Sequence, residues 1–260
     1  MKLTISFASM SRFNPQVIRY ESLPSTNTEA ARLAAQGATE GLCVVADEQT
    51  AGRGRLQRSW ISPKGAGLYF SALLRPSMPQ NQWSLITFMA ALAVSDALRD
   101  ACELKTDIKW PNDLLAGERK ICGILAEAIE TEKGRAVVVG IGINLTKEAF
   151  PPKLNELAIS VEEATAKRPE PEVLLAVLLR AFSSWYSLLQ ETGGQQRILE
   201  AWASRSSFAK GKRVKVINGN EVVIGITGGV ESDGALRVET ETVGVRIIRA
   251  GDVTSLRTSV

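Results

Sequence analysis

Residues 109–145 read KWPNDLLAGERKICGILAEAIETEKGRAVVVGIGINL, and this stretch decides the fold class. Three apolar runs within it are separated by short turns at 116–118 and 132–134, each of which contains a glycine. Strands joined by such short turns form hairpins, so they pair antiparallel. Hairpin-linked strands speak against a doubly wound parallel sheet. They predict an α+β protein whose core is a mixed or mostly antiparallel sheet with helices.

Helices and further strands are predicted on both sides of this stretch. Thr26 and Glu29 have the spacing of a helix N-terminal capping box, and Gly37 ends the alanine-rich run that follows. Ser160 and Glu163 have the same capping-box spacing. The other predicted elements are strands at 42–46, at 68–74 and ending at Ile108, a core helix at 82–101, and a long helix at 173–189 that starts at Pro169–Pro171.

The pattern changes after Trp202. Short alternating runs with glycine-rich turns predict strands at 212–217, 221–226, 235–239 and 243–248. A β unit of roughly 50 residues is marginally stable alone, so we expect it to dock on the rest of the chain. We therefore divide the sequence into a main domain, residues 1–207, and a small C-terminal β-barrel domain, residues 208–260.

Composition excludes several classes of function. Apolar residues make up 45% of the 260 residues and charged residues 23%, so wholesale disorder is excluded. The net charge of +3 is too balanced for a dedicated nucleic-acid binder. The chain has no histidine, so a Ser-His-Asp triad and histidine-ligated zinc are both excluded. Acid–base chemistry would fall to carboxylates, lysines or the phosphates of a substrate.

The cysteine content and the apolar segments of the sequence indicate the cellular compartment of the protein. Cys43, Cys102 and Cys122 show no paired spacing, and an odd cysteine count without a secretory signal is typical of a reducing compartment. Residues 1–15 lack a long apolar segment followed by a cleavage site. The apolar run near 85–94 is shorter than the roughly 20 residues that span a bilayer. We predict a cytoplasmic protein with no membrane contact.

Residues 52–71, GRGRLQRSWISPKGAGLYFS, form a glycine- and arginine-rich loop that runs into a strand. Glycines let the backbone approach a ligand closely. Arg53, Arg55 and Arg58 carry planar, permanently charged groups that suit phosphate or carboxylate oxygens. The segment therefore favours a loop that wraps a small anion. By itself it is equally compatible with a solvated basic loop or an arm that lies along nucleic acid.

Three motifs taken together are more specific. The strings GRGRLQRSW at 52–60, KWPND at 109–113 and GIGIN at 140–144 resemble those of the biotin protein ligases. These enzymes activate biotin with ATP as biotinyl-5'-AMP and attach it to a lysine of a carrier domain. The resemblance covers residues 25–145, with weaker support up to the C-terminus. It implies a class II synthetase-like biotin/lipoate ligase core and a C-terminal SH3-like β-barrel.

The resemblance also bears on gene regulation. Some biotin ligases carry an N-terminal helix-turn-helix that represses biotin genes. About 24 residues precede Ser25, which is too few for that module. We therefore expect a monofunctional ligase without an N-terminal DNA-binding domain, and no binding to DNA.

Positions that match the family motifs imply the biotin contacts. Ser25 and Thr26 offer hydroxyls that can donate and accept, as a cyclic urea requires. The same two residues could instead serve as helix caps. The implied biotin-binding residues are Ser25, Thr26, Asn27, Gln49, Gly52, Arg53, Arg55, Lys120, Gly123, Gly140 and Gly142.

The resemblance also implies a nucleotide site and three catalytic residues: Lys120, Arg55 and Asp113. Lys120 would contact the biotin carboxylate and the α-phosphate region and stabilise transition-state charge. Asp113 would orient or deprotonate the carrier lysine, and its carboxylate suits Mg²⁺. The implied ATP- and adenylate-binding residues are Arg53, Arg55, Arg58, Trp60, Lys109, Asn112, Asp113, Lys120 and Asn144.

Simpler interpretations remain open at single positions. Lys120 could be an exposed lysine at a hairpin turn, and Trp60 a core tryptophan. Asn112 and Asp113 could provide ordinary turn chemistry. The glycines of 140–144 lack the G-x-G-x-x-G spacing and the following helix of a dinucleotide site, so NAD binding is excluded.

Three rival functions are weighed against biotin ligation. A lipoate or other acyl–carrier ligase shares the core architecture, although the GRGRLQRSW and KWPND strings favour biotin. A nucleic-acid-binding module would use residues 53–58 as a basic arm, with affinity that falls steeply with salt. A catalytically retired binding protein is the third. The expected partner is a biotin carboxyl carrier protein, and an edge strand could pair with it or with a second copy in a homodimer.

Overall fold

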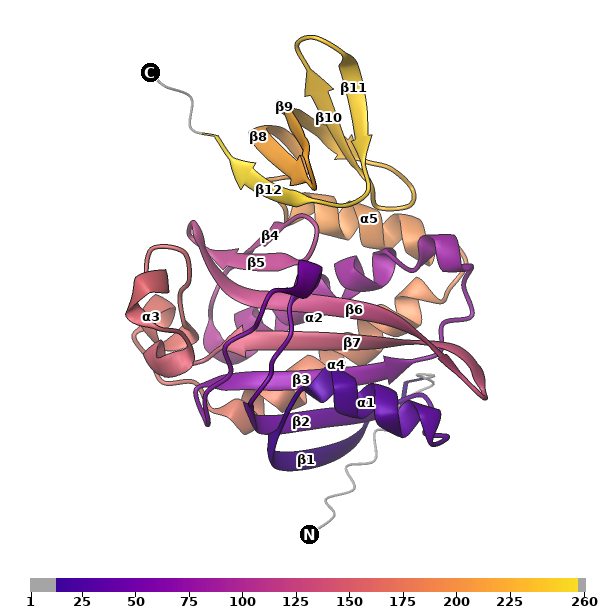
Figure 1. Ribbon diagram of the computed structural model, residues 1–260, viewed down its shortest axis with the longest axis vertical. Helices are drawn as coiled ribbons and strands as arrows, with labels where there is room; N and C mark the ends of the chain where they lie inside the picture. Colours follow the sequence, from indigo (N-terminus) through magenta and orange to yellow (C-terminus); the bar gives the residue numbers. More distant parts are fainter. Residues whose placement is uncertain (1–12, 257–260) are drawn as a thin grey trace.

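The computed structural model describes residues 13–256 (Figure 1). A seven-stranded sheet forms the centre of the molecule, and a five-stranded sheet forms its C-terminal part. Residues 1–12, which make up most of the stretch predicted to lack a secretory signal, lie outside the described residues, as do residues 257–260.

The central sheet has the strand order β1-β2-β3-β7-β6-β5-β4. Strands β1 and β2 pair parallel, whereas the other neighbours in this sheet pair antiparallel. The predicted mixed, mostly antiparallel sheet is therefore confirmed, and its two central hairpins are β5–β6 and β6–β7. The strands are β1 Gln16–Leu23, β2 Leu42–Gln49, β3 Gly67–Leu74, β4 Asp107–Lys109, β5 Asp113–Ala116, β6 Arg119–Thr131 and β7 Gly134–Asn144.

Helices cover both faces of the central sheet (Figure 1). Helix α1 packs alone against β2, β3 and β7 through a small apolar cluster that includes Ala30, Val44 and Val138. Helices α2, α4 and α5 form the thicker layer on the opposite face. The α-helices are α1 Thr26–Ala35, α2 Leu85–Cys102, α3 Val161–Thr165, α4 Pro171–Leu189 and α5 Gly194–Ser204. The 3₁₀ helices are η1 Arg55–Gln57, η2 Gln80–Gln82, η3 Lys147–Ala149 and η4 Pro152–Leu154.

Helix α4 is long and apolar enough, by length and composition alone, to cross a membrane. It packs against α2, and residues at helical spacing along one face, among them Leu174, Leu178 and Phe182, are fully buried. Val173 on the same helix is 53% exposed. This one-sided burial is typical of a core helix in a globular domain.

The predicted capping box at Thr26 and Glu29 is wrong. Ser25 is the N-cap residue of α1, and its side chain makes no capping hydrogen bond. Glu29 instead accepts hydrogen bonds from Tyr20 and Arg32. One partner from β1 and one from the same helix thus occupy the Glu29 carboxylate in place of a capping contact, which leaves the side chains at the start of α1 available to the sheet. The capping box of Ser160 and Glu163 is confirmed at α3.

Among the α-helices and strands, three were not predicted: β1, α5 and β12. Strand β1 is an almost wholly exposed edge strand without a continuous apolar run, which explains why no pattern marked it. Strand β12 is four residues long. Both strands exist because a neighbouring strand provides their hydrogen-bond partners.

The C-terminal sheet is antiparallel and has the order β11-β10-β9-β8-β12. The turn before β10 rests on the main part of the chain: Trp110 Nε1 donates to the Gly234 carbonyl at 2.9 Å, and Ser84 Oγ donates to that of Asp233. The predicted docking of this unit is thus observed. Its strands are β8 Lys210–Asn218, β9 Glu221–Val230, β10 Leu236–Thr240, β11 Gly244–Ile248 and β12 Asp252–Ser255.

Candidate active site

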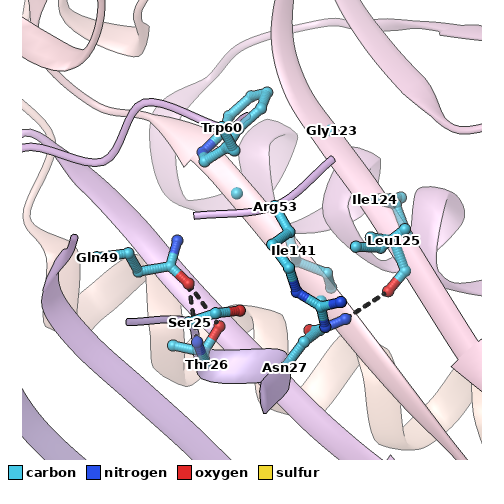
Figure 2. A pocket seen from close by; sticks show the side chains of 12 residues that line it. Ser25, Thr26, Asn27, Gln49, Arg53, Trp60, Gly123, Ile124, Leu125 and Ile141 are labelled. Carbon is cyan, nitrogen blue, oxygen red and sulfur yellow. Dashed lines mark hydrogen bonds between the residues drawn. The ribbon is translucent and has the colours of Figure 1, made fainter. Parts of the chain in front are cut away.

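A pocket lies where the start of α1 faces β6 and β7 (Figure 2). Most of the predicted biotin-binding residues line it, whereas Gly52, Arg55 and Lys120 lie outside its lining. Ile124, Leu125 and Ile141 were not predicted, because ordinary apolar strand residues carry no motif. The lining residues are Ser25, Thr26, Asn27, Gln49, Arg53, Trp60, Gly123, Ile124, Leu125, Gly140, Ile141 and Gly142.

Gln49 organises one side of this pocket. Its Oε1 accepts from the backbone N–H of Thr26 at 2.8 Å and from Thr26 Oγ1 at 3.1 Å (Figure 2). Its Nε2 donates to Ser62 Oγ at 2.8 Å, which sets the orientation of the amide. The Thr26 hydroxyl proton is therefore used on Gln49, and toward other groups this hydroxyl acts as an acceptor.

Asn27 is held from both ends of its amide. Its Nδ2 donates to the Leu125 carbonyl at 3.2 Å and to Glu127 Oε2 at 2.7 Å. Ser71 Oγ donates to Asn27 Oδ1 at 2.6 Å and also lies 2.7 Å from Thr26 Oγ1. Both Asn27 N–H groups are consequently used inside the protein, so Asn27 presents acceptor capacity to a ligand.

Ser71 and Glu127 are functional candidates that the sequence prediction missed. Ser71 is fully buried within the otherwise apolar strand β3, and a lone polar residue in such a run was the available signal. Glu127 lies on the half-exposed second half of β6, where a carboxylate is unremarkable by pattern.

The pocket walls contain glycines because neighbouring side chains leave no room for a Cβ atom. A Cβ on Gly140 would lie 2.2 Å from Asn27 Oδ1, and one on Gly142 would lie 2.5 Å from Trp60 Nε1. The Trp60 ring also lies 3.0 Å from the Cβ position of Gly123. Trp60 is thus a pocket wall and not a core tryptophan. Its Nε1 is buried and has no hydrogen-bond partner within residues 13–256.

Lys120 and Asp113 form an ion pair beside this wall. Lys120 Nζ lies 2.6 Å from Asp113 Oδ1 and 5.2 Å from the centre of the Trp60 ring. The β5–β6 pairing shifts register just after Lys120, because Leu115 pairs with Lys120 but Leu114 pairs with Cys122, and β-bulges of this kind are common near active sites. Lys120 is therefore directed at a carboxylate and an aromatic face, unlike a free lysine at a hairpin turn.

A second, larger cavity adjoins the first and shares Ile124 and Leu125 with it. Arg55 and Asn112 line this larger cavity, and the turn before β10 closes its far side. Arg55 donates to Asn112 Oδ1 at 3.0 Å, while Asn112 Nδ2 donates to the Ile124 carbonyl at 2.8 Å. Burial lowers the pKa of Arg55 from its ordinary value. The two predicted regions, loop 52–60 and KWPND, therefore meet here.

The remaining predicted nucleotide residues surround these cavities. Arg58 forms an ion pair with Asp252 of the C-terminal sheet, and Arg53 forms one with Glu127 at 2.7 Å. Burial lowers the pKa of Lys109, partly offset by the nearby Asp113 carboxylate. Two further predicted residues, Gly52 and Asn144, make close contacts within the protein. A Cβ on Gly52 would lie 2.3 Å from the Trp60 carbonyl oxygen, and Asn144 Nδ2 donates to the Ile159 carbonyl at 3.2 Å.

A protein-built metal cage is absent from the described part of the chain, which holds no group of three or more candidate ligands. Asp113 can supply one carboxylate, and that carboxylate is already paired with Lys120. Mg²⁺ commonly uses one or two carboxylates together with substrate phosphates. The donor set here therefore fits Mg²⁺ that arrives with ATP. Burial raises the pKa of the free thiols of Cys43 and Cys122, so neither is suited as a nucleophile.

Comparison with known proteins agrees with this geometry. The model of the biotin/lipoate A/B protein ligase family matches residues 20–144. Over 241 residues the chain is 35% identical to the bifunctional ligase/repressor BirA of Bacillus subtilis, covering 91% of this chain and 73% of that protein. Over 243 residues it is 37% identical to the biotin–[acetyl-CoA-carboxylase] ligase of Paracoccus denitrificans, covering 88% of this chain and 96% of that protein.

A solved structure supports the same assignment. The biotin protein ligase of Aquifex aeolicus, in complex with biotin and ATP, matches with a TM-score of 0.79 and 30% identity. The match covers 93% of this chain and 99% of that protein. The chain belongs to the biotin/lipoate protein ligase family, and the relatives from Paracoccus denitrificans and Aquifex aeolicus are biotin ligases. The family prediction and the predicted fold class are confirmed.

Proposed function

We propose that this protein activates biotin with Mg-ATP as biotinyl-5'-AMP and transfers the biotinyl group to a lysine of a biotin carboxyl carrier protein. The observation that carries the proposal is the polarity of the first pocket. Thr26 Oγ1 and Asn27 Oδ1 both contact Ser71 Oγ, and each oxygen keeps further acceptor capacity for a ligand once its internal hydrogen bonds are counted. They suit the two N–H groups of a cyclic urea, while the buried hydroxyl of Ser25 can donate to its carbonyl.

The same polarity favours biotin over lipoate, the main alternative within the family. A dithiolane ring has no N–H groups, so it would leave buried acceptors without partners. An unpaired buried polar group costs about 1–3 kcal/mol, whereas apolar walls discriminate weakly between rings of similar size. The proposal therefore names the ureido ring as the group that this pocket selects.

Adenylation follows from the neighbouring cations. A biotin carboxylate oxygen forms a bond to the α-phosphorus of ATP, the bond to the β-phosphate oxygen breaks, and pyrophosphate leaves. Both reactants are negative, so cations must offset their charge. We assign Lys120 and Arg55 to this task at the junction of the two cavities, with Arg53, Arg58 and Lys109 around the phosphates. The larger cavity would hold the nucleotide, with Asn112 in its lining and Trp60 in the wall of the adjoining pocket.

Transfer requires an unprotonated amine. The amine nitrogen of the carrier lysine attacks the acyl carbon of the mixed anhydride, AMP leaves, and the nitrogen loses a proton. We assign acceptance of that proton to Asp113, the carboxylate beside Lys120 at this junction. Trp60, packed over Gly123 and Gly142, would shield the mixed anhydride from water until the carrier arrives.

The proposal also covers the protein partner of this enzyme and its location in the cell. The sequence evidence for a reducing compartment, together with family membership, supports a cytoplasmic ligase that modifies a carboxylase carrier domain. The unpaired edge of β1 is the place where a carrier strand or a second copy of this chain would pair. We retain residues 208–260 as a separate C-terminal domain that supports the nucleotide cavity.

The test is pyrophosphate release from Mg-ATP by the purified protein, with biotin, with lipoate, and with neither acid. We expect release that depends on biotin and is reduced about 10²–10³-fold in Lys120→Ala. Lys167→Ala, which removes a surface lysine paired with Glu103, is the matched control and should retain wild-type rates. Release with lipoate in preference to biotin would refute the assignment of the pocket. Release with neither acid would refute adenylation.

A further inference from the structure

Glu127 connects three parts of the protein behind the first pocket. Its Oε2 accepts from Asn27 Nδ2 at 2.7 Å and from Arg53 Nη2 at 2.7 Å. One carboxylate oxygen on β6 therefore joins the start of α1 to the loop of residues 52–60. Its side chain is 31% exposed and does not line the pocket, so its effect on a ligand must pass through Asn27 and Arg53.

The orientation of the Asn27 amide decides what the pocket offers a ligand. An amide can be turned so that either its oxygen or its NH₂ group faces a given side. Here Glu127 and the Leu125 carbonyl accept from the NH₂ group, and Ser71 donates to the oxygen. The reversed amide would put the NH₂ group where the oxygen now lies, and it would present donors to the ring. Gly140 leaves the oxygen room, because any Cβ there would lie 2.2 Å from it.

We propose that Glu127 is a positioning residue that sets substrate specificity by holding Asn27 as an acceptor and Arg53 beside the pocket. The pocket consequently selects acids whose ring carries N–H donors and disfavours rings that carry none. This inference rests on the proposed biotin ligation and names the residue that gives the site its polarity. Figure 2 shows Arg53 extending toward Asn27, which faces Leu125 across the pocket.

The first test compares Glu127→Ala with Glu127→Gln and with Glu130→Ala. Glu130 is the matched control because it lies on the same strand and pairs with an arginine, Arg135, away from the pocket. We expect Glu127→Ala to raise the KM for biotin about tenfold while kcat changes less. The ratio of kcat/KM for biotin to kcat/KM for lipoate should fall by a similar factor. Glu127→Gln retains an acceptor oxygen, so it should recover most of the biotin preference. A wild-type KM and preference in Glu127→Ala would overturn the inference.

The second test reverses the hydrogen bond. Asn27→Asp places two carboxylates against each other, and we expect biotin binding to weaken sharply. Adding Glu127→Gln supplies a side-chain NH₂ group that can donate to one oxygen of the aspartate introduced at position 27. The other oxygen of that aspartate stays available to the ligand. The double variant should therefore bind biotin about tenfold more tightly than Asn27→Asp alone. A double variant that binds no better than the single one would show that the contact does not orient the side chain at position 27.

Two outcomes separate this inference from the proposed function. If the wild-type protein shows no biotin-dependent pyrophosphate release, biotin ligation itself is refuted. If the wild type is active and the Glu127 variants keep its specificity, the positioning role alone is refuted. Thermal unfolding of each variant verifies that the protein is folded, and direct biotin binding by calorimetry gives a reading that does not depend on turnover.

Discussion

The first pocket and the surroundings of Arg58 are built in opposite ways. We assigned Arg58, on the loop of residues 52–60, to the ATP phosphates, and we call its surroundings the phosphate-facing region. In the pocket the polar groups are buried: Thr26 and Asn27 are 4% exposed and Ser71 is fully buried. These side chains form hydrogen bonds with one another and lie on strand β3 and at the start of helix α1. In the phosphate-facing region the cation Arg58 lies on a loop, and its side chain is 66% exposed. Its partner is the Asp252 carboxylate, which belongs to β12 of the C-terminal sheet.

This difference assigns recognition of the biotin ring to the first pocket and neutralisation of the ATP phosphates to the phosphate-facing region. A buried network has a single low-energy arrangement, so it can present a defined pattern of acceptors before the ligand arrives. An exposed ion pair such as Arg58–Asp252 is worth about 0–1 kcal/mol, so the phosphates of ATP can replace its carboxylate at little cost. Substitutions in the pocket should therefore affect biotin strongly, whereas those in the Arg58–Asp252 pair should affect ATP weakly.

The largest effect is expected where the two regions meet. Asp113→Ala removes the proposed proton acceptor and the partner of Lys120, so transfer to the carrier should fall by about 10²–10⁴-fold. The measurement is single-turnover transfer from preformed biotinyl-AMP to a carrier domain, alongside pyrophosphate release. Normal transfer combined with lost adenylate formation would show that Asp113 acts on the nucleotide and not on the acceptor lysine.

Gly140→Ala tests the pocket side of the comparison. The added methyl group would lie 2.2 Å from Asn27 Oδ1, so it displaces the acceptor or the strand. Overpacking of this kind costs about 1–3 kcal/mol, and we expect biotin affinity to fall up to about 10²-fold with little change in the KM for ATP. Gly117→Ala, at an uncrowded turn, is the control for general loss of stability. Unchanged biotin affinity would mean that the pocket walls adjust freely.

Asp252→Asn tests the phosphate-facing side. Asp252 competes with ATP phosphates for Arg58, so its neutralisation should lower the KM for ATP about threefold, and less at high salt. Glu221→Gln removes the partner of Arg246 elsewhere on the C-terminal sheet and should leave the KM unchanged. A higher KM for ATP in Asp252→Asn would instead show that the carboxylate positions Arg58 for the nucleotide.

The smallest effect concerns pH. Burial lowers the pKa of Lys109 from its ordinary value. Its positive charge is present below the lowered pKa and is lost as the pH rises through that pKa. The loss therefore occurs at a lower pH than for an ordinary lysine. We expect the KM for ATP to rise about twofold over this alkaline range, since one partly screened charge is removed. Lys109→Arg remains charged and should shift the rise to higher pH. An identical profile in both proteins would exclude Lys109 from phosphate binding.

Local patterns predicted much of this protein correctly. The turns at 116–118 and 132–134 specify antiparallel hairpins because so short a connection permits no other pairing. The three family motifs identified the enzyme class, and several of their residues line the two adjoining cavities. In contrast, β1 and β12 have no strong pattern of their own, because edge strands depend on the neighbour that pairs with them.

The amino-acid sequence by itself determined the fold class, the family and the chemical types of residue at the site. Only the tertiary structure decided how those residues act. Asn27 and Glu127 are 100 positions apart, yet their hydrogen bond determines which end of the amide a ligand meets. Thr26 was predicted to take part in a helix capping box, but its hydroxyl proton goes to Gln49 on β2. The direction of a hydrogen bond depends on every neighbour in space, and those neighbours are brought together only when the sheet and α1 pack.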